Sequence, residues 1–134
     1  MKEQELIKIA AKARENAHVP YSHFRVGAAL LTEDGQVFSG ANIENSSYGL
    51  TICAERTAVV KAVSEGVKNF KAIAVVTDAV EPASPCGACR QVLAEFAPNL
   101  EVIMASPSGE VTKMKLSELL PLAFSAQDME ETHE

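Results

Sequence analysis

Residues 71–99 read KAIAVVTDAVEPASPCGACRQVLAEFAPN, and this stretch contains both a predicted strand and a predicted helix. The segment 71–78 is a short, continuous apolar run, which is typical of a strand covered on both faces. The segment 84–99 predicts a helix, with Ser84 as its N-cap and Pro85 at its first position. A strand of this kind needs packing partners on both sides of its sheet.

Two further helices are predicted before this stretch. Residues 3–17 place apolar side chains at helical spacing, which indicates an amphipathic helix. Residues 51–66, TICAERTAVVKAVSEG, predict a second helix with Thr51 as N-cap and Gly66 as its C-terminal stop. These helices are the expected cover for the sheet.

The remaining segments supply more strands. Residues 25–44 form two apolar runs around an Asp-Gly pair, a strong hairpin pattern. Residues 100–106 predict another buried strand, and residues 111–116 predict a fifth one after a turn. Residues 117–124 predict a short terminal helix.

The predicted elements follow the order α-β-β-α-β-α-β-β-α. This order favours an α/β fold, a three-layer α/β/α sandwich in which a mixed five-stranded sheet is flanked by helices. At 134 residues the chain is expected to be a single domain spanning 1–134. The acidic segment 126–134 is expected to be a tail that frays.

Composition excludes several classes of function. Hydrophobic residues make up 47% of the chain and charged residues 22%, which is ordinary globular composition. The net charge of −6 disfavours a nucleic-acid partner, because phosphate binding needs a basic surface. No apolar run is long enough to span a bilayer, so we expect no membrane partner. The N-terminus has no export signal, so we expect a cytoplasmic protein with reduced thiols.

The chain has three cysteines, Cys53, Cys86 and Cys89. Cys86 and Cys89 lie three residues apart at one helix start, and Cys53 lies at the start of another. Helix N-termini favour thiolate over thiol, and a set of soft sulfur ligands selects zinc. A closed structural site needs four protein ligands, whereas three leave a position for water, as in catalytic zinc sites.

Charged residues next to the cysteines suggest how such a centre works. Zinc lowers the pKa of bound water toward about 7. Glu55 is placed to take the proton from that water and deliver it to a substrate nitrogen. Three thiolates on zinc give a net charge of −1, and Arg56 and Arg90 are the candidates to withdraw density from the sulfurs.

Other interpretations of the cysteines remain open on spacing alone. All three can be buried core residues. Cys86 and Cys89 can be a dithiol redox pair, which leaves Cys53 without a role. A closed structural zinc site would take a histidine as its fourth ligand. The chain has three histidines, His18, His23 and His133, and none of them has a ligand-like spacing from a cysteine. Glu55 by itself is also consistent with a favourable charge at a helix start.

The combination of motifs resembles a known family. C-A-E followed by P-C-x-x-C is the zinc deaminase pattern in its all-cysteine form. The blocks PYSHFRVGAALL, NIENSSYG, CAER, PCGACRQVL and LLPLAF resemble the small homotetrameric cytidine deaminases, in the family's order. The similarity covers nearly the whole chain, from about residue 10 to residue 124.

The resemblance implies a reaction and roles for residues. Cys53, Cys86 and Cys89 would hold one zinc ion per subunit. Hydroxide formed at zinc would attack C4 of cytidine or 2′-deoxycytidine, with Glu55 as proton shuttle, to give uridine or 2′-deoxyuridine and ammonia in pyrimidine salvage. The mechanism is that of the zinc deaminases as a class and is implied by the resemblance.

The resemblance also implies the substrate contacts. Asn42 and Glu44 would hold the ribose, and their i, i+2 spacing at a strand end is consistent with a shared face. Phe24 would lie beside the sugar and base, and Ala54 would bind the base through its backbone. Taken alone, Asn42 and Glu44 are equally consistent with polar residues that end a strand, and Phe24 with a core aromatic.

Two aromatic residues point to an assembly. In the family, the residue matching Phe124 stacks on the pyrimidine in a neighbouring subunit's site, and the loop of Tyr48 lies near both the subunit contact and the substrate site. We therefore expect a homotetramer with sites completed across subunits. In a lone domain Phe124 would only anchor the last helix.

Three alternative functions remain. A blasticidin-type deaminase of nucleoside antibiotics shares the zinc site and the size, but the fuller match of FRVGAALL and NIENSSYG favours the plain nucleoside. Deamination of a base within RNA or DNA is disfavoured, because such relatives usually have histidine at the position of Cys53 and their substrates favour a basic groove. A non-catalytic zinc-stabilised assembly module would have no use for Glu55.

Overall fold

The computed structural model describes residues 1–130 and contains one five-stranded sheet of order β2-β1-β3-β4-β5. Strands β3 and β4 are parallel, and the other neighbours are antiparallel. The predicted mixed sheet of five strands is therefore confirmed. The strands are β1 (Val26–Thr32), β2 (Val37–Ala41), β3 (Phe70–Thr77), β4 (Glu101–Ala105) and β5 (Val111–Lys115).

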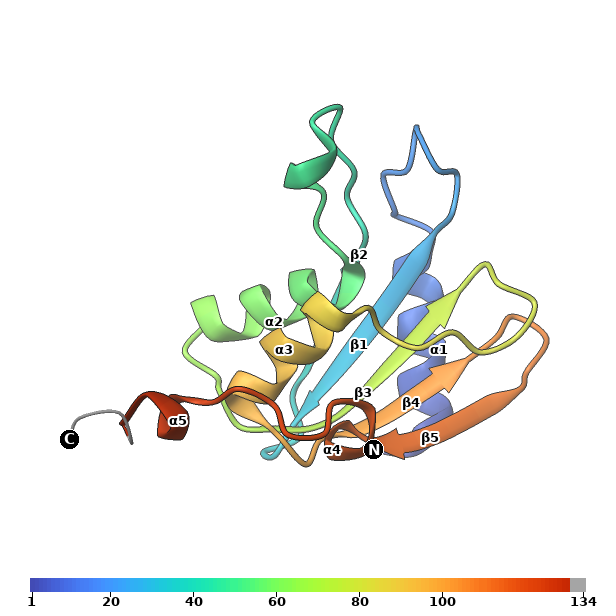
Figure 1. Ribbon diagram of the computed structural model, residues 1–134. Coiled ribbons are helices and arrows are strands. Elements are labelled where there is room, and N and C mark those ends of the chain that lie inside the picture. Colours follow the sequence, from blue (N-terminus) through green and yellow to red (C-terminus); the bar gives the residue numbers. More distant parts are fainter. Residues whose placement is uncertain (131–134) are drawn as a thin grey trace.

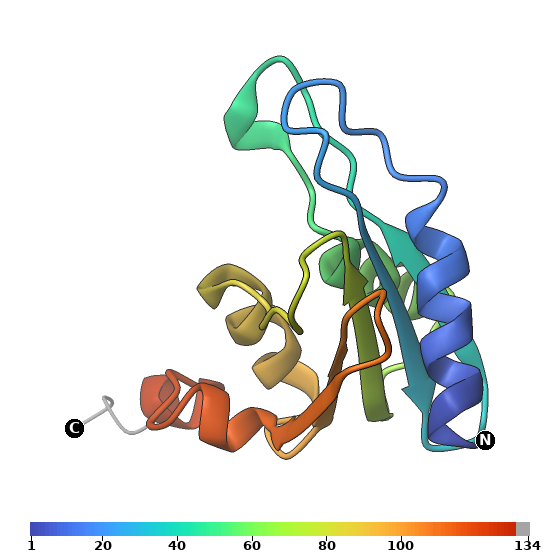
Figure 2. The same ribbon diagram turned by 90° about the vertical axis from the view of Figure 1, so that its right-hand side faces the viewer.

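Helices cover both faces of this sheet. Helix α1 packs on one face, and α2 and α3 pack on the other, which gives the predicted three layers (Figures 1 and 2). A 3₁₀ helix precedes α2, and two short helices come after β5. The helices are α1 (Glu3–Arg14), η1 (Tyr48–Leu50), α2 (Ala54–Ser64), α3 (Gly87–Phe96), α4 (Leu116–Leu119) and α5 (Ala126–Glu130). Within residues 1–130, no helix has the length and apolarity needed to cross a membrane.

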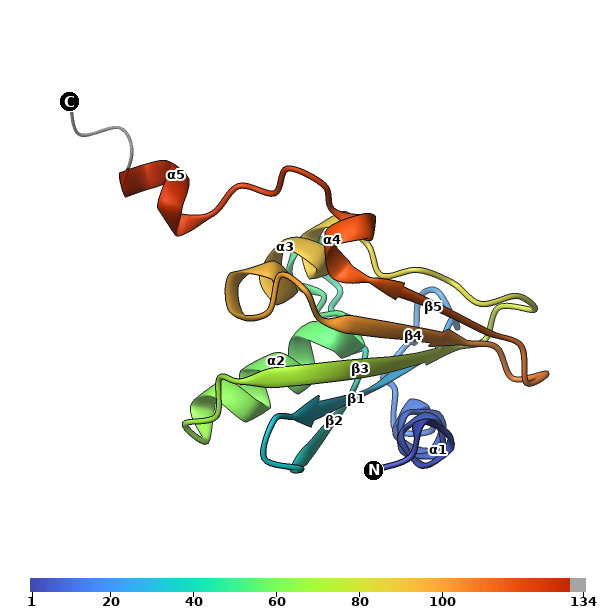
Figure 3. The same cartoon turned by 90° about the horizontal axis from the view of Figure 1, so that it is seen from below.

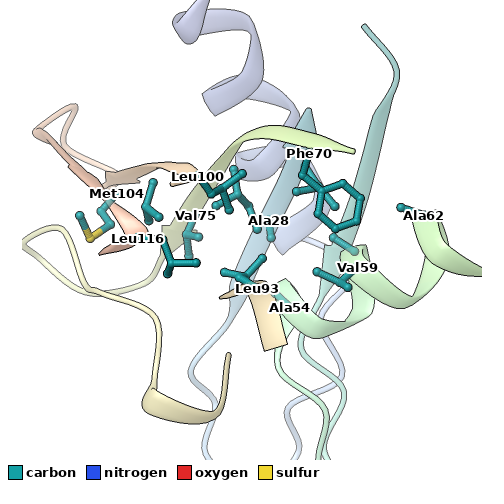
Figure 4. Packing of buried hydrophobic residues seen from close by; sticks show 14 residues of the cluster. Ala28, Ala54, Val59, Ala62, Phe70, Val75, Leu93, Leu100, Met104 and Leu116 are labelled. Carbon is teal, nitrogen blue, oxygen red and sulfur yellow. The ribbon is translucent and has the colours of Figure 1, made fainter. Parts of the chain in front are cut away.

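The core consists of two apolar clusters, one on each side of the sheet. Along β3, Ile73 and Val75 belong to the cluster under α2 and α3, whereas Ala74 and Val76 belong to the cluster under α1. This alternation explains why the strand reads as an uninterrupted apolar run. Figure 4 shows the larger cluster, in which Leu93 of α3 lies among side chains from several strands and α2.

Two glycines allow helices to lie unusually close to the sheet. A Cβ on Gly27 would stand 2.0 Å from the carbonyl oxygen of Ala10 in α1. A Cβ on Gly40 would stand 2.6 Å from the carbonyl oxygen of Ala54, the first residue of α2. The close approach at Gly40 fixes the position of the α2 start, where one of the cysteines lies.

The hairpin and the helix ends agree with the sequence to different degrees. The predicted hairpin is confirmed, since β1 and β2 join through a turn in which Gly35 has φ +89°. Thr51 and Ser84, however, are not N-caps. Each N-cap lies two residues later, at Cys53 for α2 and at Cys86 for α3.

Tertiary hydrogen bonds explain the two wrong caps. The Thr51 hydroxyl accepts a bond from the backbone N–H of Asn45, and the Ser84 hydroxyl accepts one from Arg90. These side chains are therefore used in holding loops, and neither is free to cap its helix.

The C-terminal segment differs most from its prediction. The predicted helix 117–124 is reduced to α4, because Pro121 restricts the backbone of the residue before it and the helix ends at Leu119. Beyond α4 the chain leads away from the three layers, and α5 stands off the body (Figures 1 and 3). Helix α5 falls in the segment predicted as a frayed tail, and residues 131–134 of that segment lie outside the described residues.

Candidate active site

Three cysteine sulfurs meet where the N-termini of α2 and α3 converge. Cys53 and Cys86 hold the N-cap positions of these helices, and Cys89 lies in the first turn of α3. The Sγ atoms of Cys53 and Cys86 are 3.9 Å apart, and those of Cys86 and Cys89 are 3.4 Å apart. All three lie within 4.8 Å of one another. Tetrahedral zinc with Zn–S bonds of 2.3 Å requires sulfurs about 3.8 Å apart, so these residues fit zinc.

The geometry separates the competing interpretations of the cysteines. Cys53 lies with the pair Cys86 and Cys89, although a two-cysteine redox site would leave it apart. Within residues 1–130, the group contains no histidine, so His18 and His23 do not complete a closed structural site. The third candidate, His133, lies outside the described residues.

Arg56 is the basic residue that contacts the sulfurs. Its Nη2 donates to the Cys53 Sγ at 3.5 Å and to the Thr51 carbonyl oxygen at 3.3 Å. The pKa of Cys53 is lowered, first by its hydrogen bond with Cys89 and also by the Arg56 guanidinium. The hydrogen bond with Cys53, together with burial, raises the pKa of Cys89. The cluster thus favours thiolate at Cys53, the form that binds a metal.

Arg90, the other candidate, has a different role. Its guanidinium donates to the carbonyl oxygens of Pro85 at 2.8 Å and Leu119 at 2.7 Å, and to the hydroxyl of Ser84. Arg90 therefore ties the loop before α3 to the end of α4.

Glu55 is a buried acid beside the sulfurs. It lies in the first turn of α2, two residues after Cys53, and its exposed fraction is 5%. Burial raises the pKa of Glu55 to about 7. A carboxyl group with a pKa near neutrality is well suited to take up and release a proton in the same reaction.

Glu55 and two of the cysteines line a cavity of about 190 Å³. Three residues predicted to contact the substrate, Phe24, Asn42 and Ala54, line the same cavity. The loop between β3 and α3 closes one side. The other lining residues are Val26, Thr51, Val75, Thr77, Ala83 and Ser84.

The side chain of Asn42 bonds to the start of β1. Its Oδ1 accepts from the Val26 N–H at 2.9 Å, and its Nδ2 donates to the Phe24 carbonyl oxygen at 2.9 Å. One N–H and one lone pair of the amide are left for a ligand. Asn42 is therefore both a strand clamp and a wall of the cavity.

Glu44 does not line the cavity of the cysteines. It lines an adjoining pocket of about 400 Å³, and Thr51 lines both. The sequence led us to expect Asn42 and Glu44 on one face of a strand end. In the structure β2 ends at Ala41, both residues follow it, and they line different cavities.

The two predicted aromatic residues are exposed. Tyr48 is 74% exposed and packs edge-to-face on Tyr21, with ring centroids 5.7 Å apart. Phe124 is 62% exposed and lines a pocket of about 240 Å³ beside the C-terminal segment. Within one chain, therefore, Phe124 does not line the cavity of Glu55 and the cysteines.

Sequence reasoning missed the polar residues that hold the cavity walls. Asp78 accepts bonds from the backbone and side chain of Arg25 and forms an ion pair with Arg14 at 3.4 Å. Ser22 bonds to Glu44. The only sequence signal was position, since Asp78 directly follows a buried strand and Ser22 lies in the PYSHF block.

A zinc centre with three protein ligands and an adjacent acid is the arrangement of catalytic, hydrolytic zinc enzymes. The comparisons with known proteins narrow this class. Residues 1–105 match the family model described as the cytidine and deoxycytidylate deaminase zinc-binding region. The chain belongs to the cytidine and deoxycytidylate deaminase family.

Individual relatives agree with this assignment. The chain is 58% identical over 130 residues to a cytidine deaminase of Halalkalibacterium halodurans, covering 96% of this chain and 98% of that protein. A crystal structure of cytidine deaminase from Burkholderia pseudomallei is 51% identical, with a TM-score of 0.90, and the match covers 92% of this chain and 100% of that one. A blasticidin-S deaminase of Bacillus cereus is a more distant relative, at 33% identity over 90% of this chain and 91% of that protein.

Proposed function

We propose that this chain catalyses the hydrolytic deamination of cytidine and 2′-deoxycytidine to uridine and 2′-deoxyuridine, with release of ammonia. The observation that carries the proposal is one cavity lined both by Glu55, Cys53 and Cys86 and by the predicted substrate contacts, Phe24 and Asn42. The 58% identity to a cytidine deaminase, against 33% to a blasticidin-S deaminase, supports the plain nucleoside as substrate.

Cys53, Cys86 and Cys89 would hold a zinc ion, which when bound would supply the Lewis acid that makes water nucleophilic at neutral pH. Glu55 takes a proton from the attacking water and delivers it to N3 of the pyrimidine. The water oxygen forms a bond to C4, and the bond between C4 and the amino nitrogen then breaks. Glu55 takes the second proton from the hydroxyl oxygen now on C4 and passes it to that nitrogen, which leaves as ammonia while C4 becomes a carbonyl carbon.

The burial of Glu55 suits both halves of this proton transfer. A carboxyl group with a pKa of about 7 exchanges protons readily with water and with a ring nitrogen at neutral pH. Arg56 offsets part of the thiolate charge through its bond to Cys53.

The pair of adjoining cavities matches the two parts of a nucleoside. The base occupies the cavity of the cysteines, where Phe24 and the backbone of Ala54 contact it. The sugar extends past Thr51, which lines both cavities, toward Glu44. Asn42 contributes its remaining N–H and lone pair from the first cavity.

The active form is a homotetramer whose sites are completed across subunits. The exposure of Tyr48 and Phe124 supports this proposal, because large apolar side chains in a chain with 5% aromatic residues are usually buried or used at an interface. A fully active monomer in light scattering would contradict it.

We place the enzyme in the cytoplasm and in pyrimidine salvage. The three cysteines are free in the structure, and a reducing compartment keeps such thiols available to zinc.

The proposed function is tested by measuring ammonia release from cytidine by the purified protein, before and after zinc removal by a strong chelator. We expect rapid release that is lost on stripping and returns with zinc. No release from the zinc-loaded tetramer would contradict cytidine as substrate, and blasticidin S is then the next substrate to assay.

A further inference from the structure

The carboxylate of Glu44 is held by the turn that precedes β1. Its Oε1 accepts from the backbone N–H groups of Tyr21 at 3.0 Å and Ser22 at 3.2 Å. Its Oε2 accepts from the hydroxyl of Ser22. These bonds fix both oxygens of a side chain that reaches the turn from more than twenty residues away.

Counting acceptors shows what remains for a ligand. A carboxylate offers about four lone-pair sites, two on each oxygen. Tyr21 and Ser22 fill both sites on Oε1 of Glu44, and the Ser22 hydroxyl fills one on Oε2. One site on Oε2 is left, in a pocket of about 400 Å³ that adjoins the cavity of the cysteines. This site suits a single hydroxyl donor.

Ser22 also connects Glu44 to the wall of the other cavity. Its hydroxyl oxygen accepts from the backbone N–H of Phe24 at 3.1 Å, and Phe24 lines the cavity of the cysteines. One serine therefore bonds to the sugar-side carboxylate and to the backbone of a base-side residue. The distance between the two recognition groups is set through its hydroxyl.

The backbone of this turn is strained, so the hydrogen bonds of Ser22 are needed to hold the conformation of the turn. His23 has φ +59°, in the left-handed region that a non-glycine residue occupies only at a cost in free energy. The two bonds of the Ser22 hydroxyl, with the bond from the His23 N–H to the Val19 carbonyl oxygen, hold the turn in this conformation.

We propose that Ser22 is a positioning residue for sugar recognition, which orients Glu44 so that its one open acceptor meets one ribose hydroxyl while the base lies against Phe24. The inference rests on the proposed function. It predicts that the fall in kcat/KM on removal of the Ser22 hydroxyl depends on which ribose hydroxyls the substrate carries.

The test compares Ser22→Ala with the unchanged enzyme on cytidine, 2′-deoxycytidine and 3′-deoxycytidine. We expect kcat/KM to fall about tenfold for cytidine, mainly through KM, and equally for the deoxy substrate that keeps the hydroxyl bound by Glu44. For the substrate that lacks this hydroxyl, the fall should stay within about twofold. The ratio of kcat/KM values for two substrates, measured on one preparation, does not depend on the fraction of enzyme that is folded.

Two further variants sharpen the result. Ser22→Thr keeps the hydroxyl and should restore most of the loss on cytidine. Ser64→Ala removes an exposed hydroxyl whose hydrogen bond, within residues 1–130, goes to the Lys61 carbonyl oxygen in α2, and it should leave kcat/KM unchanged for all three substrates. In a variant that already carries Glu44→Ala, adding Ser22→Ala should no longer change the ratio of the kcat/KM values for the different substrates.

An equal loss on all three substrates, or a threonine variant as poor as the alanine variant, would overturn the inference. Such results would leave the proposed function intact, because the unchanged enzyme would still release ammonia from cytidine. A failure of the proposed function is distinguished by the absence of release from the unchanged, zinc-loaded enzyme.

Discussion

The interior of the proposed site and its outer rim are built in opposite ways. Glu55 and Cys89 are buried between the sheet and two helices, and this chain alone supplies their surroundings. Tyr48 lies in η1, in a loop that stands above the sheet (Figure 1), and Phe124 lies in the C-terminal segment, and most of the surface of each residue is exposed. The difference teaches that the residues around the cysteines all come from one fold, and we propose that a second chain covers the outer rim, which consists of Tyr48 and Phe124.

The largest effect is expected from Cys86→Ala, which tests the centre itself. Cys86 is exposed, so the substitution leaves no cavity in the core. We expect the variant to lose zinc and all measurable deamination, since only two thiolates remain. Metal analysis of the purified variant, with the activity assay on cytidine, measures this. A variant that retains zinc and activity would remove Cys86 from the ligand set.

The next effect separates the chemistry from the fold. Glu55→Gln replaces the buried acid with a group of the same shape that transfers no proton. We expect kcat to fall by about a thousandfold or more, while zinc content and assembly stay near those of the unchanged enzyme. Steady-state kinetics and metal analysis on the same sample decide the matter. Loss of zinc in this variant would make Glu55 a ligand or a structural support.

Local spacing made each half of the centre predictable, and the resemblance to the zinc deaminases supplied the prediction that the two halves meet. Cys86 and Cys89 share the start of one helix whatever the rest of the chain does, and Cys53 and Glu55 share the start of another. The strands of the core were predictable for the same reason, since β3 alternates apolar side chains between two faces.

The unpredicted features depend on contacts between distant segments. Thr51 and Ser84 were wrong as caps because Asn45 and Arg90 bond to their hydroxyls. The choice between Arg56 and Arg90 was open because Arg90 reaches the Leu119 carbonyl oxygen, 29 residues away. Spacing along the chain carries no information on such contacts. For the same reason, spacing alone does not predict what covers Tyr48 and Phe124.

Arg56→Gln tests how far the centre depends on charge around it. We expect zinc affinity or kcat/KM to fall about 10- to 100-fold, because Cys53 loses its charged donor. Arg90→Gln is the matched control, since Arg90 bonds to two carbonyl oxygens and a hydroxyl. It should lower thermal stability more than it lowers zinc affinity. Equal kinetics of Arg56→Gln and the unchanged enzyme would remove Arg56 from the centre.

Phe124→Ala tests whether the rim belongs to a neighbouring site. Stacking of one base on an aromatic ring is worth about 1–3 kcal/mol, so we expect kcat/KM to fall about tenfold or more. Mixing is the sharper measurement. Subunits with Glu55→Gln still provide Phe124, and subunits with Phe124→Ala still provide Glu55. If Phe124 completes a neighbouring site, reassembled mixtures will be more active than the sum of the two variants.

An absence of any gain on mixing, in samples shown by light scattering to contain mixed tetramers, would contradict this arrangement. Phe124 would then act within its own subunit, and the contrast between interior and rim would reduce to a difference in exposure.

The smallest effect is expected at the border between interior and rim, where Asp78 joins the end of β3 to the start of β1. Hydrogen bonds from the Arg25 side chain hold the pKa of the Asp78 carboxyl below its usual range. A carboxylate of this kind stabilises the fold at any pH above its unfolded pKa of about 4, and the contribution is lost as the pH falls through the lower folded value.

Asp78→Asn should therefore lower Tm at pH 7 by no more than about 4 °C, because the ion pair lies at the surface. The difference in Tm from the unchanged protein should stay constant from pH 8 to about pH 5, shrink as the pH falls below about 4, and disappear only below the lowered folded pKa of Asp78.

Asp34→Asn is the matched control. Asp34 bonds to Thr32 and Gln36 in the hairpin turn and has a lowered pKa, but it does not line the cavity of the cysteines. Both variants should show the same pH dependence of Tm, whereas only Asp78→Asn should raise KM for cytidine, since Thr77 and Val26 beside this junction line that cavity. If both variants left KM unchanged, Asp78 would stabilise the fold without shaping the site, and the border of the interior would lie closer to the cysteines.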